Sequence, residues 1–168
     1  RGAEVGSITK DNLEDGNVRL ISGNVLTGRQ VTEPGHIGFS TSMVTAIPEG
    51  DHYEFIGWVL PQLKKFSVSK TFLSWLTPDK EYRLDTNING GERPFVLTGE
   101  YEKVLPMDIL PVQLLKSILV EDIDRMEQLG IYEVVEEDLA LCEFTCASKR
   151  PVQSILRDGL NMLRKELE

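Results

Sequence analysis

The spacing of the apolar residues changes between residues 91 and 106, and this change constrains the fold of the 168-residue chain more than any other feature. Before it, short runs rich in β-branched and aromatic residues are separated by Gly, Pro, Asp and Asn, which is typical of strands joined by turns. We predict strands within residues 18–25, 37–47, 53–60 and 66–69. After it, apolar residues recur at helical spacing. The sequence therefore predicts an α+β fold, sheet-rich first and helical afterwards.

Three helices are predicted in the second part. The first follows Pro111, with apolar residues at helical spacing through residue 119, and the next covers 121–129, with Gly130 at its C-terminal end. The last begins after Pro151 and carries one apolar stripe, which predicts a helix packed along one face. The stripe consists of Val152, Ile155, Leu156, Leu160, Leu163 and Leu167.

Three short segments of the first part have local signals of their own. Residues 7–13 and 70–76 are predicted to form short helical turns, and Thr77-Pro78 ends the second of them. Asn and Gly dominate residues 87–91, which predicts a loop because both residues accept a positive φ at low cost.

Charge and hydropathy exclude two classes of direct partner. The net charge of −9 would repel a phosphate backbone, so we expect no nucleic-acid binding. The longest apolar run, 109–119, is interrupted by Pro111, Gln113 and Lys116 and is too short to span a bilayer. We therefore expect no transmembrane segment, and any contact with a membrane would be indirect.

The chain has few residues that bind metals. Cys142 and Cys146 are its only cysteines, and a spacing of four residues favours reduced thiols over a disulfide. His36 and His52 are its only histidines, and both are predicted in loops. Two cysteines do not complete a zinc or iron-sulfur site, which needs four ligands, unless a second copy of the chain supplies the others.

No catalytic pattern is present in the sequence. The glycine-rich segment 22–28 lacks the Lys-Ser/Thr ending of a phosphate-binding loop and the spacing of a dinucleotide-binding loop, so a strand entering a tight turn is the simpler interpretation. We also find no serine nucleophile elbow and no zinc-protease helix. The sequence assigns no catalytic, cofactor-binding or metal-binding residue.

Most of the negative charge is concentrated between residues 121 and 138, where eight acids accompany a single basic residue, Arg125. A solvated face is the simpler interpretation, and an acidic docking surface is the alternative. The acids are Glu121, Asp122, Asp124, Glu127, Glu133, Glu136, Glu137 and Asp138.

Four segments carry a resemblance to a known family: residues 18–28, 57–59, 89–93 and 136–142. Together they closely resemble the NqrA family, the NqrA subunits of Na⁺-translocating NADH:quinone reductases, and the match covers almost the whole chain. More distantly, the chain is similar to the RnfC subunit of the Rnf electron-transport complex and to the flavin subunit of respiratory complex I.

The resemblance implies three domains. Residues 1–50 would form part of a β-grasp domain of the soluble-ligand-binding, ubiquitin-like type, and 51–93 a β-rich insertion. Residues 94–168 would form an α-helical domain like a ferredoxin-type domain that has lost its clusters. Because Arg1 would fall inside the β-grasp domain, we expect a fragment without its N-terminal partner.

The resemblance also implies that two cluster-binding runs of the Rnf subunit have lost ligands here. Their positions would be taken by Phe95, Thr98, Tyr101 and Leu105 in the first run, and by Glu136, Leu139, Cys142 and Cys146 in the second. Cys142 and Cys146 would then be vestigial ligands, and we expect Phe95, Tyr101 and Leu105 to fill the space of the lost cluster.

The family implies a complex that passes electrons from NADH through flavins and an iron-sulfur centre to ubiquinone and exports Na⁺. This chain would be a peripheral, cofactor-free part on the cytoplasmic side of the bacterial inner membrane, catalytic only within the complex. We predict a role in contacts with other subunits, with exposed apolar residues such as Trp58 and Trp75 as anchors. The alternative is a quinone or small-ligand binding module, which requires a concave apolar pocket.

Overall fold

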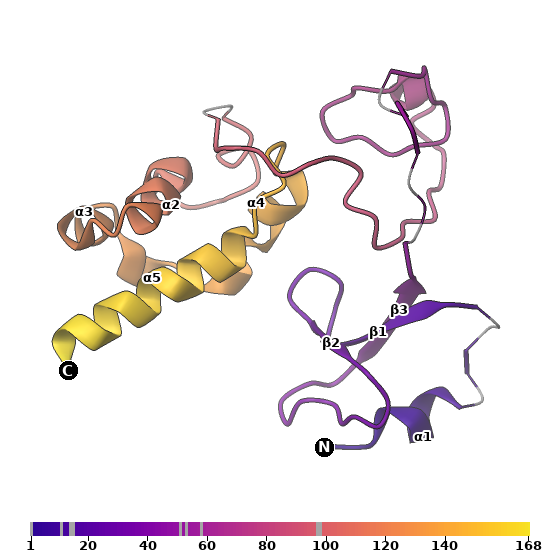
Figure 1. Cartoon of the computed structure of the whole chain (residues 1–168), viewed down its shortest axis with the longest axis horizontal. Helices are drawn as coiled ribbons and strands as arrows, with labels where there is room; N and C mark the ends of the chain where they lie inside the picture. Colours follow the sequence, from indigo (N-terminus) through magenta and orange to yellow (C-terminus); the bar gives the residue numbers. More distant parts are fainter. Residues whose placement is uncertain are drawn as a thin grey trace. The chain divides into compact units, whose positions relative to one another are not determined.

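The computed structural model contains two compact units, Arg1–Asn89 and Gly90–Glu168, here called the N-terminal and C-terminal units. It describes residues 2–10, 12–13, 16–50, 52, 54–57, 59–96 and 99–168. The N-terminal unit contains the sheet and the C-terminal unit contains the longer helices (Figure 1), so the predicted α+β class is confirmed. No helix in the described part of the chain is long and apolar enough to cross a membrane.

A three-stranded antiparallel sheet organises the N-terminal unit. Its strands are β1 (Val18–Ser22), β2 (Arg29–Val31) and β3 (Val44–Pro48), in the order β2-β1-β3. The central strand β1 contributes two buried neighbours, Leu20 and Ile21. Because successive side chains of a strand point to opposite faces, both faces of the sheet are covered at this point.

The turn between β1 and β2 confirms the simpler interpretation of the glycine-rich segment. The Asn24 side-chain oxygen accepts hydrogen bonds from the backbone N–H groups of Leu26 and Thr27, both at 2.8 Å. Gly23 has a φ of 109°, and a Cβ on Gly28 would lie 2.4 Å from the Asn24 carbonyl oxygen, so both positions favour glycine. The two N–H groups that would face a phosphate are engaged within the turn.

The other predicted strands of this unit are only partly observed. The strand predicted in 37–47 forms at its end, as β3. No strand occurs among the described residues of 53–60 and 66–69, so those two predictions, and with them the β-rich character of 51–93, are wrong for that part of the chain. Ile56 and Lys70 have positive φ values, which interrupt an extended backbone, and no neighbouring strand is available to pair with these runs.

Short helical turns occur close to their predicted places. The predicted turn at 7–13 is α1 (Val5–Thr9), and the turn at 70–76 is the 3₁₀ helix η1 (Leu73–Leu76), which ends before Pro78. Trp58 lies outside the described residues, whereas Trp75, within η1, is 54% exposed.

The C-terminal unit is a small helical domain whose helix ends follow local chemistry. Pro111 occupies the first turn of its first helix, where a missing N–H costs nothing. The Asp122 carboxylate accepts from the Arg125 N–H at 3.1 Å and caps the next helix, and Gly130 has the left-handed conformation just beyond it. The elements are α2 (Pro111–Leu119), α3 (Ile123–Gln128), η2 (Ile131–Glu133), η3 (Glu136–Leu139), α4 (Ala140–Thr145) and α5 (Val152–Leu167).

Helices α2 and α5 pack against each other and build the core of this unit (Figure 1). Leu114 and Leu115 of α2 and Leu156 of α5 are fully buried. A Cβ on Gly159 would lie 2.8 Å from Ile118 Cγ1, so the two helices approach closely at this glycine. The predicted stripe of α5 is buried except at its end, where Leu167 is exposed.

Candidate functional site

The structure brings most of the proposed ligand positions of the two cluster runs into one apolar core. Leu139 is fully buried, and its neighbours in the core are almost as inaccessible; Phe95 is half-buried and packs against this core. Thr98 lies outside the described residues, and Glu136 is the exception, because it forms an ion pair with Arg157. The positions that meet in the core are Tyr101, Leu105, Leu139, Cys142 and Cys146.

Tyr101 connects the two thiols. Its hydroxyl donates a hydrogen bond to Cys146 Sγ at 2.8 Å, and its backbone carbonyl accepts from the Cys142 thiol at a longer 3.9 Å. Its ring meets that of Phe95 edge to face, with 6.5 Å between the ring centroids. A tyrosine and a phenylalanine thus occupy the space beside the sulfurs, as expected for these two residues.

Burial keeps this cluster neutral near pH 7. It raises the pKa of the Cys142 thiol from its usual 9.0 to about 11, with a smaller contribution from the Glu102 charge. Burial first, and then the hydrogen bond to Cys146, also raises the pKa of Tyr101. Because metals bind the thiolate, and Cys142 is fully buried as a thiol, this environment is unfavourable for ligation, including ligation completed by a second copy of the chain.

We expect the C-terminal unit to lose stability as the pH rises from about 9 to about 11. The folded state holds the Cys142 proton more tightly than the unfolded chain, so this contribution is complete below the unfolded pKa and is lost as the pH approaches the folded value. Two pH units correspond to about 2–3 kcal/mol. Urea unfolding followed by circular dichroism at pH 8, 9.5 and 10.5 measures it. Cys142→Ala should flatten the profile, although Tyr101 acts in the same direction; an equally steep profile in this variant would contradict the assignment.

The acidic segment is used partly for local structure. Asp122 caps α3, and Asp138 accepts from the Val135 N–H at 3.0 Å at the start of η3. Glu127 accepts from the Tyr132 hydroxyl at 2.8 Å, and Glu136 pairs with Arg157. The predicted continuous helical stretch is instead divided among α3, η2 and η3. These four contacts favour the solvated-face interpretation for the acids that make them.

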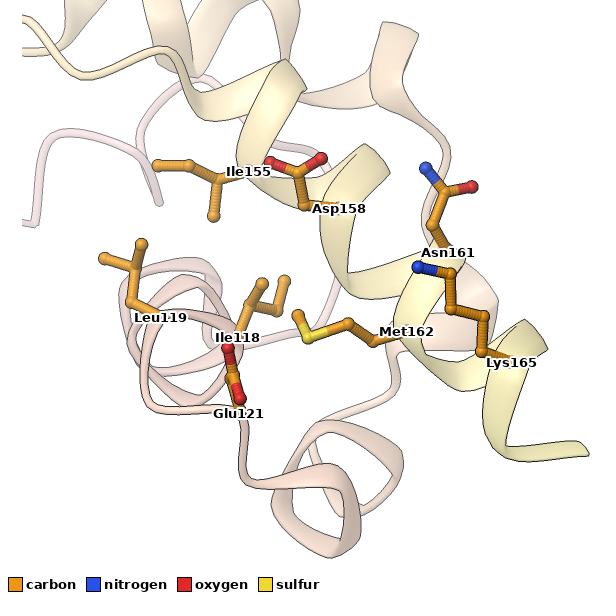
Figure 2. A pocket seen from close by; sticks show the side chains of 8 residues that line it. All are labelled: Ile118, Leu119, Glu121, Ile155, Asp158, Asn161, Met162 and Lys165. Carbon is orange, nitrogen blue, oxygen red and sulfur yellow. The ribbon is translucent and has the colours of Figure 1, made fainter.

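A shallow hollow of about 360 Å³ lies between α2 and α5. In Figure 2, Met162 of α5 points toward Ile118 of α2, while Asp158 and Lys165 stand at the rim. The mixture of opposite charges around a small apolar floor shows no preference for one class of ligand.

A second, larger groove of about 580 Å³ is lined by residues from three separate segments of the C-terminal unit. Phe95, Leu119 and Val120 provide apolar surface, and Arg93, Lys116 and Arg150 provide positive charge. Sequence analysis missed this group because its cations lie far apart along the chain. Only the adjacent Lys149-Arg150 pair is visible in the sequence, and a pair does not identify a groove.

The histidines do not contribute to a metal site in the described structure. His36 lies exposed in an isolated bridge opposite Glu4, and His52 is exposed in a loop. Within the described ranges, no group of three or more His, Cys, Asp or Glu side chains is arranged to hold a metal ion.

Comparison with known proteins places the chain in a family. Residues 1–33 match the family model described as the NQRA C-terminal domain. Relatives that carry the name of the NqrA subunit of Na(+)-translocating NADH-quinone reductase are 45% identical in Rhodopirellula baltica (93% of this chain, 36% of the relative), 42% identical in Hahella chejuensis and 43% identical in Haemophilus influenzae (98% of this chain and 37% of the relative in each). The chain spans little more than a third of these relatives' length. It belongs to the NqrA family of Na⁺-translocating NADH-quinone reductase subunits.

Proposed function

We propose that this chain is a peripheral, cofactor-free part of the Na⁺-translocating NADH:quinone reductase and that it maintains contacts between subunits. In this proposal the complex transfers electrons from NADH to ubiquinone and exports Na⁺, while other subunits carry the flavins and the iron-sulfur centre. The chain lies on the cytoplasmic side of the bacterial inner membrane and is not catalytic alone. The names of the relatives support the complex, and the surface of the N-terminal unit supports the role.

The observation that carries the assembly role is the large apolar surface of the N-terminal unit. Among its described residues, the buried apolar side chains are Val5, Leu20 and Ile21, whereas Phe55 is 92% exposed and Trp75 is 54% exposed. Large exposed aromatic side chains are unusual on an isolated soluble surface, and aromatic residues are typical energetic centres of protein interfaces. Burial by a partner protein of the complex accounts for this surface.

Replacing Trp75 with serine is expected to reduce the amount of partner subunits that co-purify with the tagged chain. A tryptophan at the centre of an interface contributes about 2 kcal/mol or more, which corresponds to roughly a 30-fold change in affinity. Leu167→Ser is a suitable control, because Leu167 is also a highly exposed apolar residue but lies at the end of α5. Equal recovery with both variants would contradict the assembly role of Trp75.

We extend the proposal to the fold of the first domain. The order β2-β1-β3 and the match of residues 1–33 to a family model support assigning residues 1–50 to part of a β-grasp domain. In that assignment, residues 51–93 remain an insertion, although their described part holds a 3₁₀ helix and loops.

The cofactor-free state has a direct test. We expect anaerobically purified protein to be colourless and to contain iron and zinc far below one equivalent per chain, because the Cys142 thiol is buried and protonated. Elemental analysis and the visible absorption spectrum measure this. Stoichiometric iron with visible absorption would show that the two thiols are working ligands.

The quinone-binding alternative receives less support from the described surface. Such a module requires an apolar pocket, and aromatic walls are the expected lining for a quinone ring. Of the two concave regions described above, the larger contributes Phe95 and the smaller has no aromatic side chain. The three cations of the larger groove favour an anionic ligand instead.

A further inference from the structure

The groove of about 580 Å³ in the C-terminal unit combines two chemistries in one place. Lys116, Leu119 and Val120 lie three and four residues apart along α2 and its C-cap, so they share one side of the helix. The opposite wall is formed by residues 92–95, and Val120 is 71% exposed. A ligand here would touch positive charge and a continuous apolar surface together.

Arg150 is held ready for an anion. Its guanidinium carbon lies 5.8 Å from the centroid of the Phe95 ring, which fixes the plane of the group. Its Nε is buried and has no hydrogen-bond partner among the described residues. Its nearest carboxylate is that of Glu92, at 3.9 Å and largely exposed, which gives only a weak surface pair. A donor of this kind gains most from a ligand oxygen that enters the groove.

The positive charge of the groove is local. The chain as a whole carries −9, yet the groove has three cations against one carboxylate, Glu92. Anionic surfaces should therefore repel the molecule everywhere except at this groove. Binding to an anionic surface would be informative, because general electrostatic attraction could not produce it.

The lining also distinguishes among anionic ligands. The backbone N–H of Arg93 donates to the Ser148 carbonyl at 2.9 Å, and that of Arg150 donates weakly to Cys146 Sγ at 3.5 Å, so neither is free to pair with an extended peptide. Apart from the cations and Glu92, the lining side chains are apolar, which leaves a nucleotide base without polar partners. An aliphatic tail suits this floor.

We propose that this groove binds one anionic phospholipid, with the phosphate between Arg93, Lys116 and Arg150 and the start of the acyl chain on Phe95, Leu119 and Val120. The three cations supply charge-assisted hydrogen bonds to the phosphate oxygens. The apolar residues remove the upper methylene groups from water. The proposal concerns these residues alone and does not depend on the assembly role.

The test measures co-sedimentation of the chain with vesicles of phosphatidylcholine, with or without phosphatidylglycerol at about one third of the lipid. We expect binding only to the anionic vesicles and its loss in salt. Arg93→Gln with Lys116→Gln should weaken this binding by about 25-fold, since each cation near an anionic surface contributes roughly a factor of five. Both side chains are exposed, so the fold should tolerate the change. Arg164→Gln with Lys165→Gln removes the same charge from the exposed end of α5 and should leave binding intact.

A second arm identifies the source of the anion. A soluble short-chain phosphatidylglycerol should displace the chain from vesicles, whereas inorganic phosphate at the same concentration should not, because it lacks a tail for the apolar floor. Val120→Ser should weaken lipid binding while leaving the helical circular dichroism unchanged. No binding to anionic vesicles, equal losses in the two double variants, or displacement by inorganic phosphate alone would each overturn the proposal.

Discussion

Replacing Tyr101 with alanine is expected to lower the free energy of unfolding of the C-terminal unit by about 3–5 kcal/mol. The ring is almost completely buried, meets Phe95 edge to face, and its hydroxyl donates to Cys146 Sγ. Removing it leaves a cavity beside two buried thiols and a sulfur without its donor. Because small domains are stable by only about 5–15 kcal/mol, this change should bring the unit close to unfolding. Urea titration followed by circular dichroism at 222 nm reports on this helical unit.

Tyr101→Phe is the matched control, because it keeps the ring and removes only the hydroxyl. We expect it to cost about 1 kcal/mol, the contribution of one hydrogen bond to a weak acceptor. The difference between the two variants isolates the packing of the ring in the space that the family resemblance assigns to a lost cluster. Nearly equal costs for alanine and phenylalanine would show that the ring does not fill that space.

Replacing Gly159 with valine is expected to cost about 1–3 kcal/mol, because the first added atom already conflicts with α2. A Cβ at this position would lie 2.8 Å from Ile118 Cγ1 and 2.9 Å from Cδ1, and Ile118 is itself buried. Glycine within a helix is unfavourable by up to about 1 kcal/mol relative to alanine, so its presence here is explained by the close crossing of α2 and α5. The same urea titration measures the loss.

Two further variants separate crowding from helix propensity. Asn161→Val introduces the same β-branched residue at an exposed position of α5 and should cost only a few tenths of a kcal/mol. Ile118→Ala combined with Gly159→Val should cost less than the sum of the two single changes, because the smaller side chain makes room for the valine. Strict additivity would show that the two side chains do not meet.

The helical half of the fold could be predicted from the sequence, because periodicity and end residues both mark its helices. Pro111 and Gly130 mark helix boundaries within a residue or two of the observed ones. The α5 stripe is long enough for its period to be unmistakable. The core around Tyr101 and Cys146 followed from the family resemblance, since no local pattern brings residues 45 positions apart together.

The first half could be predicted only where strands have partners. Residues 53–60 and 66–69 have strand-like composition, yet β propensity depends on a neighbouring strand and on burial, and their described residues have neither. The groove was invisible for a related reason. Arg93, Lys116 and Arg150 belong to three segments, and only the packing of α2 and the residue 92–95 segment within the C-terminal unit places them around one hollow.

The closing pair of helices, α2 and α5, sets the order in which the chain can fold as it is synthesised. The β1–β2 hairpin closes across the Asn24 turn and can form within microseconds of leaving the ribosome. The C-terminal core is different, because α2 finds its main partner in α5, the last helix of the unit. Leu114, Leu115 and their neighbours must therefore wait, exposed, until about 40 further residues have been added, a delay of some seconds at ordinary rates of translation. During that interval the C-terminal unit is the part of the nascent chain most dependent on protection from chaperones.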